Sequence, residues 1–355
     1  MTLYPGFSTD RMDVIFSLSS RVAAMCAVEA AVATAQGAAG DIPGDAAAAI
    51  VAACGEPIGV EILANGWQVG TPVLGLLDVL RSRLAEDARP FLHHALTTQD
   101  VVDSAAMVLS TEAVQHLDDL AGAAEASMRR IIRQFGHIAT QARSFLQPAD
   151  VTTVGFRTAR WLSQMERVRH RPTPIQAQLG GLIGDRMGIS DEVGYAVARQ
   201  LGLNDRMPWH TDRASVIALV THVVDYARWA DKVGTDIAQL VQLGEITTRA
   251  GGSSAAAGKR NPIDAMRAMA AAEACLGVST IITHAKPHEL ERGLGSWHAE
   301  WFALPLVFQT AAAAMEAIGA ALESLEVEPS DVIVAADRRA AADAYVTSVL
   351  GNRPP

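Results

Sequence analysis

The sequence predicts an all-α fold, and three features of the chain support this prediction. Half of its 355 residues are hydrophobic but only 5% are aromatic, and alanine supplies much of the remainder. Alanine is the strongest helix former and lets neighbouring helices approach closely. Strand-like alternation is sparse, whereas apolar residues recur three and four positions apart over long stretches. A chain of this length has room for two or three domains that share a large core.

Three apolar seams predict the long helices, at residues 107–138, 216–241 and 304–325. Their spacing is typical of helices that pack into a bundle, and their many Ala and Gly residues allow tight packing. Long helices that are apolar on more than one face usually bury part of that surface against other subunits, so we expect an oligomer. The seam residues are Met107, Val114, Leu117, Ala121, Ala124, Met128, Ile131, Phe135 and Ile138; Val216, Val220, Val223, Ala227, Ala230, Gly234, Ile237 and Val241; and Leu304, Val307, Ala311, Ala314, Ile318, Ala321 and Leu325.

The breaks between these patterns divide the chain into three predicted domains. Residues 1–103 contain shorter helices separated by turn-rich segments such as "GDIPGD" and "NGWQVGTP". Residues 104–283 carry the first two seams and are expected to form the central bundle. Residues 284–355 are expected to form a small C-terminal helical domain.

Charge and cysteine content exclude several classes of function. The net charge is −10 and no basic block is present, which argues against nucleic acid or an anionic membrane surface as a partner. The cysteines Cys26, Cys54 and Cys275 form no CxxC pair, so neither a disulfide framework nor a metal site is expected. The N-terminal stretch is charged where a signal peptide is apolar, and we expect no membrane-spanning run. A cytoplasmic protein without a cofactor is therefore predicted.

The segment "GGSSAAAGKRNP", residues 251–262, is the strongest candidate for chemistry. A glycine-rich loop that leads into a helix N-terminus is a ready anion-binding site. Asn261 is expected to cap that helix and Pro262 to open it, so a structural role for Asn261 stays open. A plain loop does not require Ser253, Ser254 and Lys259, which makes these three the better candidates for function.

Four further segments carry polar side chains near predicted helix ends. They are "HHALTTQDVVDSA", "QARSFLQPADVTT", "PWHTDR" and "ELERGLGSWHAEW". Taken singly, each is compatible with helix capping or with a structural histidine. The candidate binding residues in them are His93, Thr97, Thr98, His210, Arg213 and Arg292.

Together these segments resemble the fumarase/aspartase superfamily, and within it the muconate cycloisomerase branch. The most specific marks are the serine loop that ends in "KRNP" and the "WHAEW" segment, and the likeness extends over nearly the whole chain. The resemblance implies three all-α domains, with the central bundles forming a twenty-helix core in a homotetramer. It also implies active sites that are each built from three subunits.

The resemblance implies chemistry at the carbon next to a carboxylate, through an aci-carboxylate intermediate. In a cycloisomerase, one carboxylate of a muconate tricarboxylate adds to a double bond of the same molecule, and a neighbouring carbon is protonated. Ser254 is the implied general acid/base, and Lys259 the implied stabiliser of the anionic intermediate. Implied substrate contacts are Thr97, Thr98, His210, Arg213, Ser253, Asn261, Arg292 and His93.

Departures from the superfamily pattern keep alternatives open. Ala256 and Ala257 replace the usual Met-Pro, followed by Gly258, and Ser144-Phe145 replaces the Thr-His pair of many lyases. A cycloisomerase needs no acid for a leaving group, so the missing His fits that reaction. The alternatives are a cycloisomerase for a 3-sulfo-substituted muconate, a fumarate-releasing lyase of the adenylosuccinate or argininosuccinate type, and a helical scaffold without catalysis.

Overall fold

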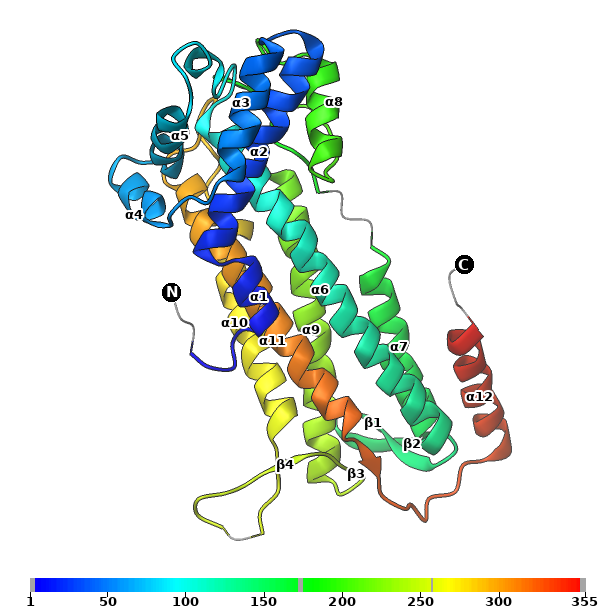
Figure 1. The fold of residues 1–355 in the computed structure, drawn as a ribbon. Helices are drawn as coiled ribbons and strands as arrows, with labels where there is room; N and C mark the ends of the chain where they lie inside the picture. The colour runs from blue at the N-terminus through cyan, green and yellow to red at the C-terminus, as the bar shows by residue number, and fades with distance from the viewer. Residues whose placement is uncertain (1–3, 172–174, 257, 352–355) are drawn as a thin grey trace.

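The computed structural model describes residues 4–171, 175–256 and 258–351, and these residues are mostly helical (Figure 1). The helices are α1 (Asp10–Ile15), α2 (Leu18–Ala39), α3 (Gly44–Gly55), α4 (Glu61–Gln68), α5 (Pro72–Arg83), the 3-10 helix η1 (Arg89–Phe91), α6 (Thr98–Phe135), α7 (Val154–Arg169), α8 (Asp191–Gln200), α9 (Ala214–Gln242), α10 (Ile263–Thr283), α11 (Ser296–Glu323) and α12 (Ala336–Gly351). The predicted all-α class is confirmed.

Helices α6, α7, α9, α10 and α11 lie side by side as a long bundle (Figure 1). All three predicted seams face its core: Leu117, Val220 and Ala311, for example, are fully buried. Small residues set the helix spacing, as at Gly234 of α9, where an added Cβ would lie 3.2 Å from the carbonyl oxygen of Ala265 in α10. Alanine and glycine therefore serve the close packing that the composition predicts.

Short helices cover one end of the bundle, which we call the upper end because Figure 1 draws it at the top. Helices α6, α9 and α11 begin there, and α2 packs on α3, α6 and α8. The predicted boundary at residue 103 falls inside α6, and α11, from the predicted C-terminal part, packs against α9 and α10 in the bundle. The three-domain division stays a prediction.

Three helices, α2, α10 and α11, are long and apolar enough to cross a membrane by length and composition alone. The expectation that no run reaches this length was therefore wrong. In the structure α2 and α11 are mostly buried inside the protein, with 61% and 72% of their apolar windows covered. The value for α10 is only 39%, so this helix presents an uncovered face with Met266, Ala270 and Gly277 on it.

The opposite end, which we call the lower end, carries short strands (Figure 1). Helices α6 and α9 end there and α10 begins there. Each strand pairs antiparallel with one partner. The pairs are β1 (Ala139–Ser144) with β2 (Gln147–Thr153), β3 (Ile246–Thr247) with β6 (Glu326–Val327), and β4 (Ala250–Gly251) with β5 (Asn261–Pro262).

Candidate functional site

The start of α6 at the upper end carries Thr97 and Thr98, for which the sequence predicts substrate binding. Thr97 is the extended N-cap residue, Thr98 opens the helix, and both are half-buried. The carboxylate of Asp100 accepts hydrogen bonds from the backbone N–H groups of Thr97 at 2.9 Å, Gly180 at 2.7 Å and Gly181 at 3.0 Å. A carboxylate in the first turn also complements the helix dipole. Asp100 thus fixes where both threonines lie.

His210, another predicted substrate contact, is enclosed by the protein and only 4% exposed. Its Nε2 lies 3.2 Å from Oδ1 of Asp100, and its carbonyl accepts a hydrogen bond from Gln99 Nε2 at 2.8 Å. A Cβ at Gly180 would lie only 2.8 Å from the ring, so a glycine is needed for this packing. His210 therefore positions Asp100 through Nε2, its Nδ1 is buried without a partner among the described residues, and its contact with substrate stays a prediction.

Arg213 is engaged entirely within the chain, which corrects its predicted role as a substrate contact. Its Nη1 donates to Oδ2 of Asp103 at 2.7 Å, and its Nε donates to Oε1 of Glu300 at 3.1 Å. Burial alone would lower the pKa of Arg213, but the charges of Asp103 and Glu300 outweigh burial and raise it. Trp297 completes the cluster by donating Nε1–H to Asp103 at 2.9 Å. This ion-pair cluster joins α6 to the starts of α9 and α11.

Arg292 and His93 also lie at the upper end. Arg292 is half-buried and donates to Gln99 Oε1 at 3.4 Å and to the carbonyl of Leu182 at 2.9 Å, next to the threonines of the α6 start. His93 has a positive φ of 61°, and its Nδ1 lies 2.6 Å from Oε1 of Glu29 on α2. Arg292 therefore stays a candidate for substrate binding, whereas His93 braces the turn before α6.

The serine loop, residues 251–262, lies at the lower end (Figure 1). Ser254 and Lys259 are exposed, and within the described residues their side chains make no hydrogen bond or ion pair. Ser253 behaves differently, because its Oγ accepts from the backbone N–H groups of Ala255 at 3.3 Å and Ala256 at 3.2 Å. Ser253 thus shapes the turn and leaves Ser254 and Lys259 available to a ligand.

The predicted helix cap at Asn261 was wrong. Helix α10 begins at Ile263 with Pro262 as its N-cap residue, and Asn261 belongs to strand β5. The side-chain Nδ2 of Asn261 donates across the neck of the loop to the carbonyl of Gly252 at 2.9 Å. Asp264 does lie in the first turn and accepts from Arg249 Nε at 2.8 Å. Ala257, one of the residues that depart from the superfamily pattern, lies outside the described residues.

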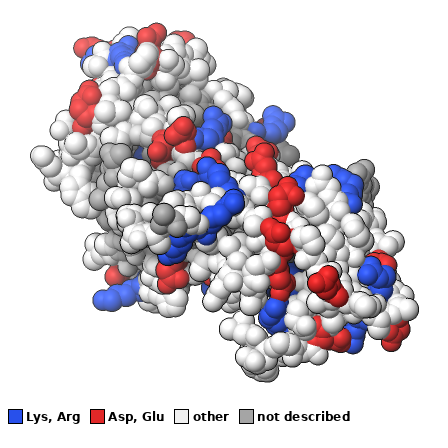
Figure 2. Space-filling view, turned by 90° about the horizontal axis from the view of Figure 1, so that it is seen from below, with Lys and Arg blue, Asp and Glu red and all other residues white. Residues whose placement is uncertain are grey.

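A cleft at the lower end, lined by no residue of the serine loop, was missed by the sequence analysis. It has a volume of about 380 Å³ and lies between the β1–β2 hairpin, α7 and α9, with Arg143, Arg157, Arg160 and Lys232 in its wall. Figure 2 shows the lower end as a whole from below, with Lys and Arg side chains near its middle beside a row of Asp and Glu side chains. The four cations in the wall of the cleft are spread over residues 143–232, so they form no local basic block that could be recognised in the sequence.

The two groups of candidate residues lie at opposite ends of one chain (Figure 1). Helix α9 begins directly after Arg213 and ends eight residues before Ala250, where the neck of the serine loop starts. At ~1.5 Å per residue, its 29 residues span about 43 Å. Ser254 and Lys259 therefore cannot act on the same small molecule as Thr97, Thr98 and Arg292 of the same chain.

Among the described residues, no three His, Cys, Asp or Glu side chains are grouped as a metal site requires. The polar groups at both ends suit anionic ligands: backbone amides and hydroxyls at the α6 start, and a lysine with a serine on the loop. This chemistry fits the binding of carboxylates.

Comparison with known proteins places the chain in a family. A family model described as lyase matches residues 6–277. The chain belongs to this lyase family, in the fumarase/aspartase superfamily. It is 32% identical to the 3-carboxy-cis,cis-muconate cycloisomerase of Acinetobacter baylyi, over 90% of this chain and 75% of that protein.

Two further lyase-family proteins bear on the site. The 3-carboxy-cis,cis-muconate cycloisomerase of Pseudomonas aeruginosa is 32% identical over 91% of this chain and 74% of its own. The crystal structure of the 3-carboxy-cis,cis-muconate lactonizing enzyme of Pseudomonas putida superposes with a TM-score of 0.83, at 28% identity, over 91% of this chain and 76% of that chain. The predicted resemblance to the cycloisomerase branch is therefore confirmed.

Proposed function

We propose that this protein is a cofactor-independent cycloisomerase that converts 3-carboxy-cis,cis-muconate to a carboxymuconolactone. The observation that carries the proposal is the similarity to cycloisomerases along nine tenths of the chain, together with the lyase family match over residues 6–277, which includes the serine loop. Ser254 and Lys259 support it, because both are exposed and their side chains have no partner among the described residues, which leaves them free to meet a substrate. The reaction belongs to the breakdown of protocatechuate in the cytoplasm.

The reaction is an isomerisation, so every atom of the substrate is retained. A carboxylate oxygen forms a C–O bond to one carbon of a double bond, and the π electrons move to the carbon next to a second carboxylate. That carboxylate becomes an aci-carboxylate with two negative charges. The Lys259 ammonium offsets this charge. The Ser254 hydroxyl transfers its proton to the carbon, which completes the lactone, and then regains a proton from water.

Thr97, Thr98 and Arg292 hold the other carboxylates. The two hydroxyls stand at the amino end of α6, where the helix dipole favours negative charge. Arg292 adds a full positive charge beside them, held by Gln99 and Leu182. Ser253 and Asn261 shape the serine loop that brings Ser254 and Lys259 to the substrate.

Because these groups lie at opposite ends of one chain, we propose that the complete site forms between copies in a homotetramer. The span of about 43 Å along α9 is the first support. The second is the uncovered face of α10, whose Ala270 and Gly277 permit close approach of another helix. The third is Phe145 at the tip of the β1–β2 hairpin, which is 99% exposed and thus suited to an interface.

The test follows the ultraviolet absorbance of 3-carboxy-cis,cis-muconate with purified protein, since lactone formation removes one of two conjugated double bonds. We expect absorbance to fall without release of fumarate. A panel with the 3-sulfo analogue, adenylosuccinate and argininosuccinate separates the alternatives. Turnover of a succinyl adduct with none of the muconates would overturn the proposal, and turnover of nothing would favour a non-catalytic scaffold.

A further inference from the structure

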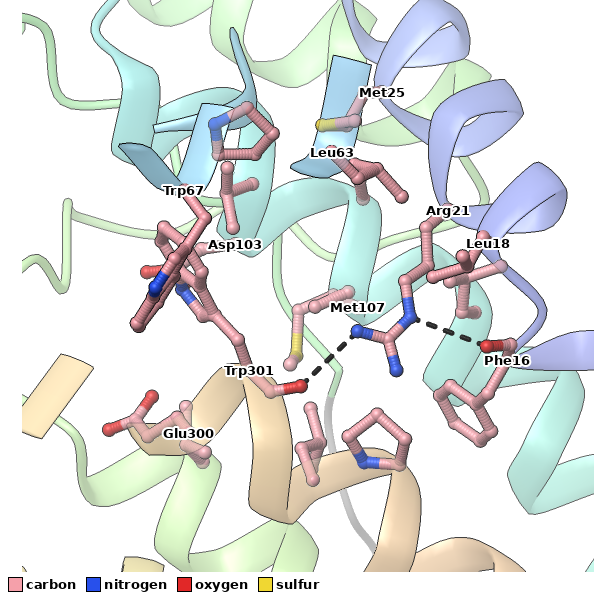
Figure 3. A pocket seen from close by; sticks show the side chains of 18 of the residues that line it. Phe16, Leu18, Arg21, Met25, Leu63, Trp67, Asp103, Met107, Glu300 and Trp301 are labelled. Atoms are coloured by element: carbon pink, nitrogen blue, oxygen red, sulfur yellow. Dashed lines mark hydrogen bonds between the residues drawn. The ribbon is translucent and has the colours of Figure 1, made fainter. Parts of the chain in front are cut away.

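A cavity of about 220 Å³ lies at the upper end between α2, α4, α5, α6, α9 and α11 (Figure 3). Its wall is largely apolar, with Met25, Leu63, Met107 and Leu304 among the lining residues. Among the residues that the sequence predicts to bind substrate or to act in catalysis, only Arg213 lines the cavity. The structure commits Arg213 to the ion-pair cluster. The cavity is therefore distinct from the proposed catalytic site.

Arg21 is the polar group that this cavity leaves unsatisfied. Its Nε donates to the carbonyl of Phe16 at 3.3 Å and its Nη1 to the carbonyl of Trp301 at 3.2 Å. The third nitrogen, Nη2, has no partner among the described residues, and no carboxylate there pairs with this guanidinium. Figure 3 shows the group projecting between Met107 and Phe16. Burial lowers the pKa of Arg21, as expected for a desolvated cation held by neutral carbonyls.

The two acidic residues of the wall do not serve Arg21. Asp103 accepts from Arg213, Gln99 and Trp297, and Glu300 accepts from Arg213. Their oxygens are committed to donors in the wall, on the side of the cavity away from Arg21 (Figure 3). A charged arginine is strongly favoured to find a carboxylate when it leaves bulk water. The unpaired Nη2 thus marks the place for the acid group of a ligand.

The remainder of the cavity suits a flat apolar body. The rings of Trp67 and Trp301 line it, with centroids 6.5 Å apart in an edge-on arrangement. The indole Nε1 of Trp301 is buried and unpartnered among the described residues. An apolar cavity of about 150 Å³ holds one benzene molecule, so 220 Å³ accommodates a ring that carries a carboxylate.

We propose that this cavity binds a small aromatic monocarboxylate, with its acid group on Arg21 and its ring between Met107 and the two tryptophans. The site goes beyond the proposed function, because it requires neither the serine loop nor a second copy of the chain. Its occupant contacts the back of the Asp103–Arg213–Glu300 cluster.

The test is titration of the full-length protein with benzoate, followed by calorimetry and by the fluorescence of Trp67 and Trp301. We expect saturable binding at one molecule per chain. Benzamide, of the same shape but neutral, should bind at least about 10-fold more weakly, since a charge-assisted hydrogen bond is lost. Cyclohexanecarboxylate tests the ring geometry. Equal binding of benzoate and benzamide, or no saturable binding of benzoate, would overturn the proposal even without a variant.

Variants locate the site. Arg21→Gln should remove the preference for benzoate over benzamide, whereas Arg21→Lys keeps part of it. Ala106→Leu, which narrows the cavity from α6, should weaken both ligands. Arg133→Gln, at an exposed arginine near the end of α6, is the matched control and should change nothing. Should Arg21→Gln fail to fold, Ala106→Leu still decides, because unchanged benzoate binding there contradicts the site.

The outcome is separable from that of the proposed function. Ser254→Ala and Lys259→Met proteins should bind benzoate with unchanged affinity, because their side chains do not line this cavity. Loss of benzoate binding in Lys259→Met would place the ligand in the catalytic site and overturn the inference. Failure of the muconate assay, by contrast, leaves the benzoate titration intact as a test.

Discussion

The two ends of the bundle present polar residues in opposite states. At the upper end Asp100, Asp103, His210 and Arg213 are buried and bonded to one another or to neighbouring backbone. At the lower end Ser254 and Lys259 stand exposed on a loop, with no side-chain partner among the described residues. At the upper end most polar groups are engaged inside the protein, with the Nη2 of Arg21 and the indole Nε1 of Trp301 as exceptions, whereas the two loop side chains at the lower end have no partner among the described residues.

This difference supports the division of roles proposed for the two ends of the chain. Buried polar clusters hold geometry, because their members bond to one another and an unpaired group would be costly. Free groups on a glycine-bearing loop can move to a ligand and enclose it. In the function proposed above, the upper end positions the threonines and Arg292, and the lower end brings the proton-transfer groups to another copy of the chain.

The largest expected effect is on catalysis, at Ser254. Ser254→Ala should lower turnover of 3-carboxy-cis,cis-muconate by about 10²- to 10⁴-fold, the usual contribution of a general acid/base. Thermal unfolding should not change, because Ser254 is exposed. Ser253→Ala, which removes a turn-shaping hydroxyl, is the control and should lose less. Turnover near the wild-type rate in Ser254→Ala would remove this residue from the proton transfer.

Next in size is a loss of stability at the upper end. Asp103→Ala leaves Arg213 with one carboxylate in a buried place, which should cost about 3–5 kcal/mol of unfolding free energy. Chemical denaturation measures this directly. Asp78→Ala, at an exposed ion pair with Arg81, should cost about 0–1 kcal/mol. Similar losses of unfolding free energy in the two variants would contradict the stabilising role assigned to the cluster of Asp103, Arg213 and Glu300.

Glu245 at the lower end makes a pH-dependent contribution to the stability of the protein. Burial opposes its charge, but hydrogen bonds from Thr140 and Arg143 and the charge of Arg157 hold the pKa of Glu245 below its usual 4.5. The Glu245 carboxyl therefore binds a proton more readily in the unfolded chain than in the folded protein. Its contribution to the free energy of unfolding is complete above about pH 5 and is lost as pH falls further. Glu245→Gln should cost about 1–2 kcal/mol at pH 7 and flatten the acid limb of stability against pH. An unchanged acid limb would contradict the assignment.

The smallest expected effect distinguishes two roles for Asn261. As the loop lock seen in the structure, its amide donates to Gly252, so Asn261→Asp should lose about 1 kcal/mol and some activity. As a helix cap, aspartate would be equivalent to asparagine. Chemical denaturation and the muconate assay of Asn261→Asp beside Asn261→Ala decide between the two, since a cap predicts that only the alanine variant suffers.

Periodicity predicted the bundle well because seam positions such as Leu117 and Val220 face a core whatever their partners are. The sequence around Asn261 is typical of a helix cap, but in the structure Asn261 pairs with Gly251 in a short antiparallel strand pair instead. Asp100 and Asp103 went unnoticed: Asp100 lies in the first helical turn, where an acidic residue ordinarily needs no partner beyond the dipole, and Asp103 follows in the second turn. Asp100 accepts a hydrogen bond from the backbone of Gly180, and Asp103 accepts one from the side chain of Arg213. Both partners are distant in the sequence.

The central claim is that one catalytic site takes its two halves from different copies of the chain. Its most direct test co-expresses Ser254→Ala with a Thr98→Val, Arg292→Met double variant under separate tags, and assays the doubly purified mixed oligomer. Each variant alone should be nearly inactive. Random mixing leaves about a quarter of the sites with both intact halves, so roughly a quarter of wild-type activity should return. No recovery in a proven mixed oligomer would contradict the account.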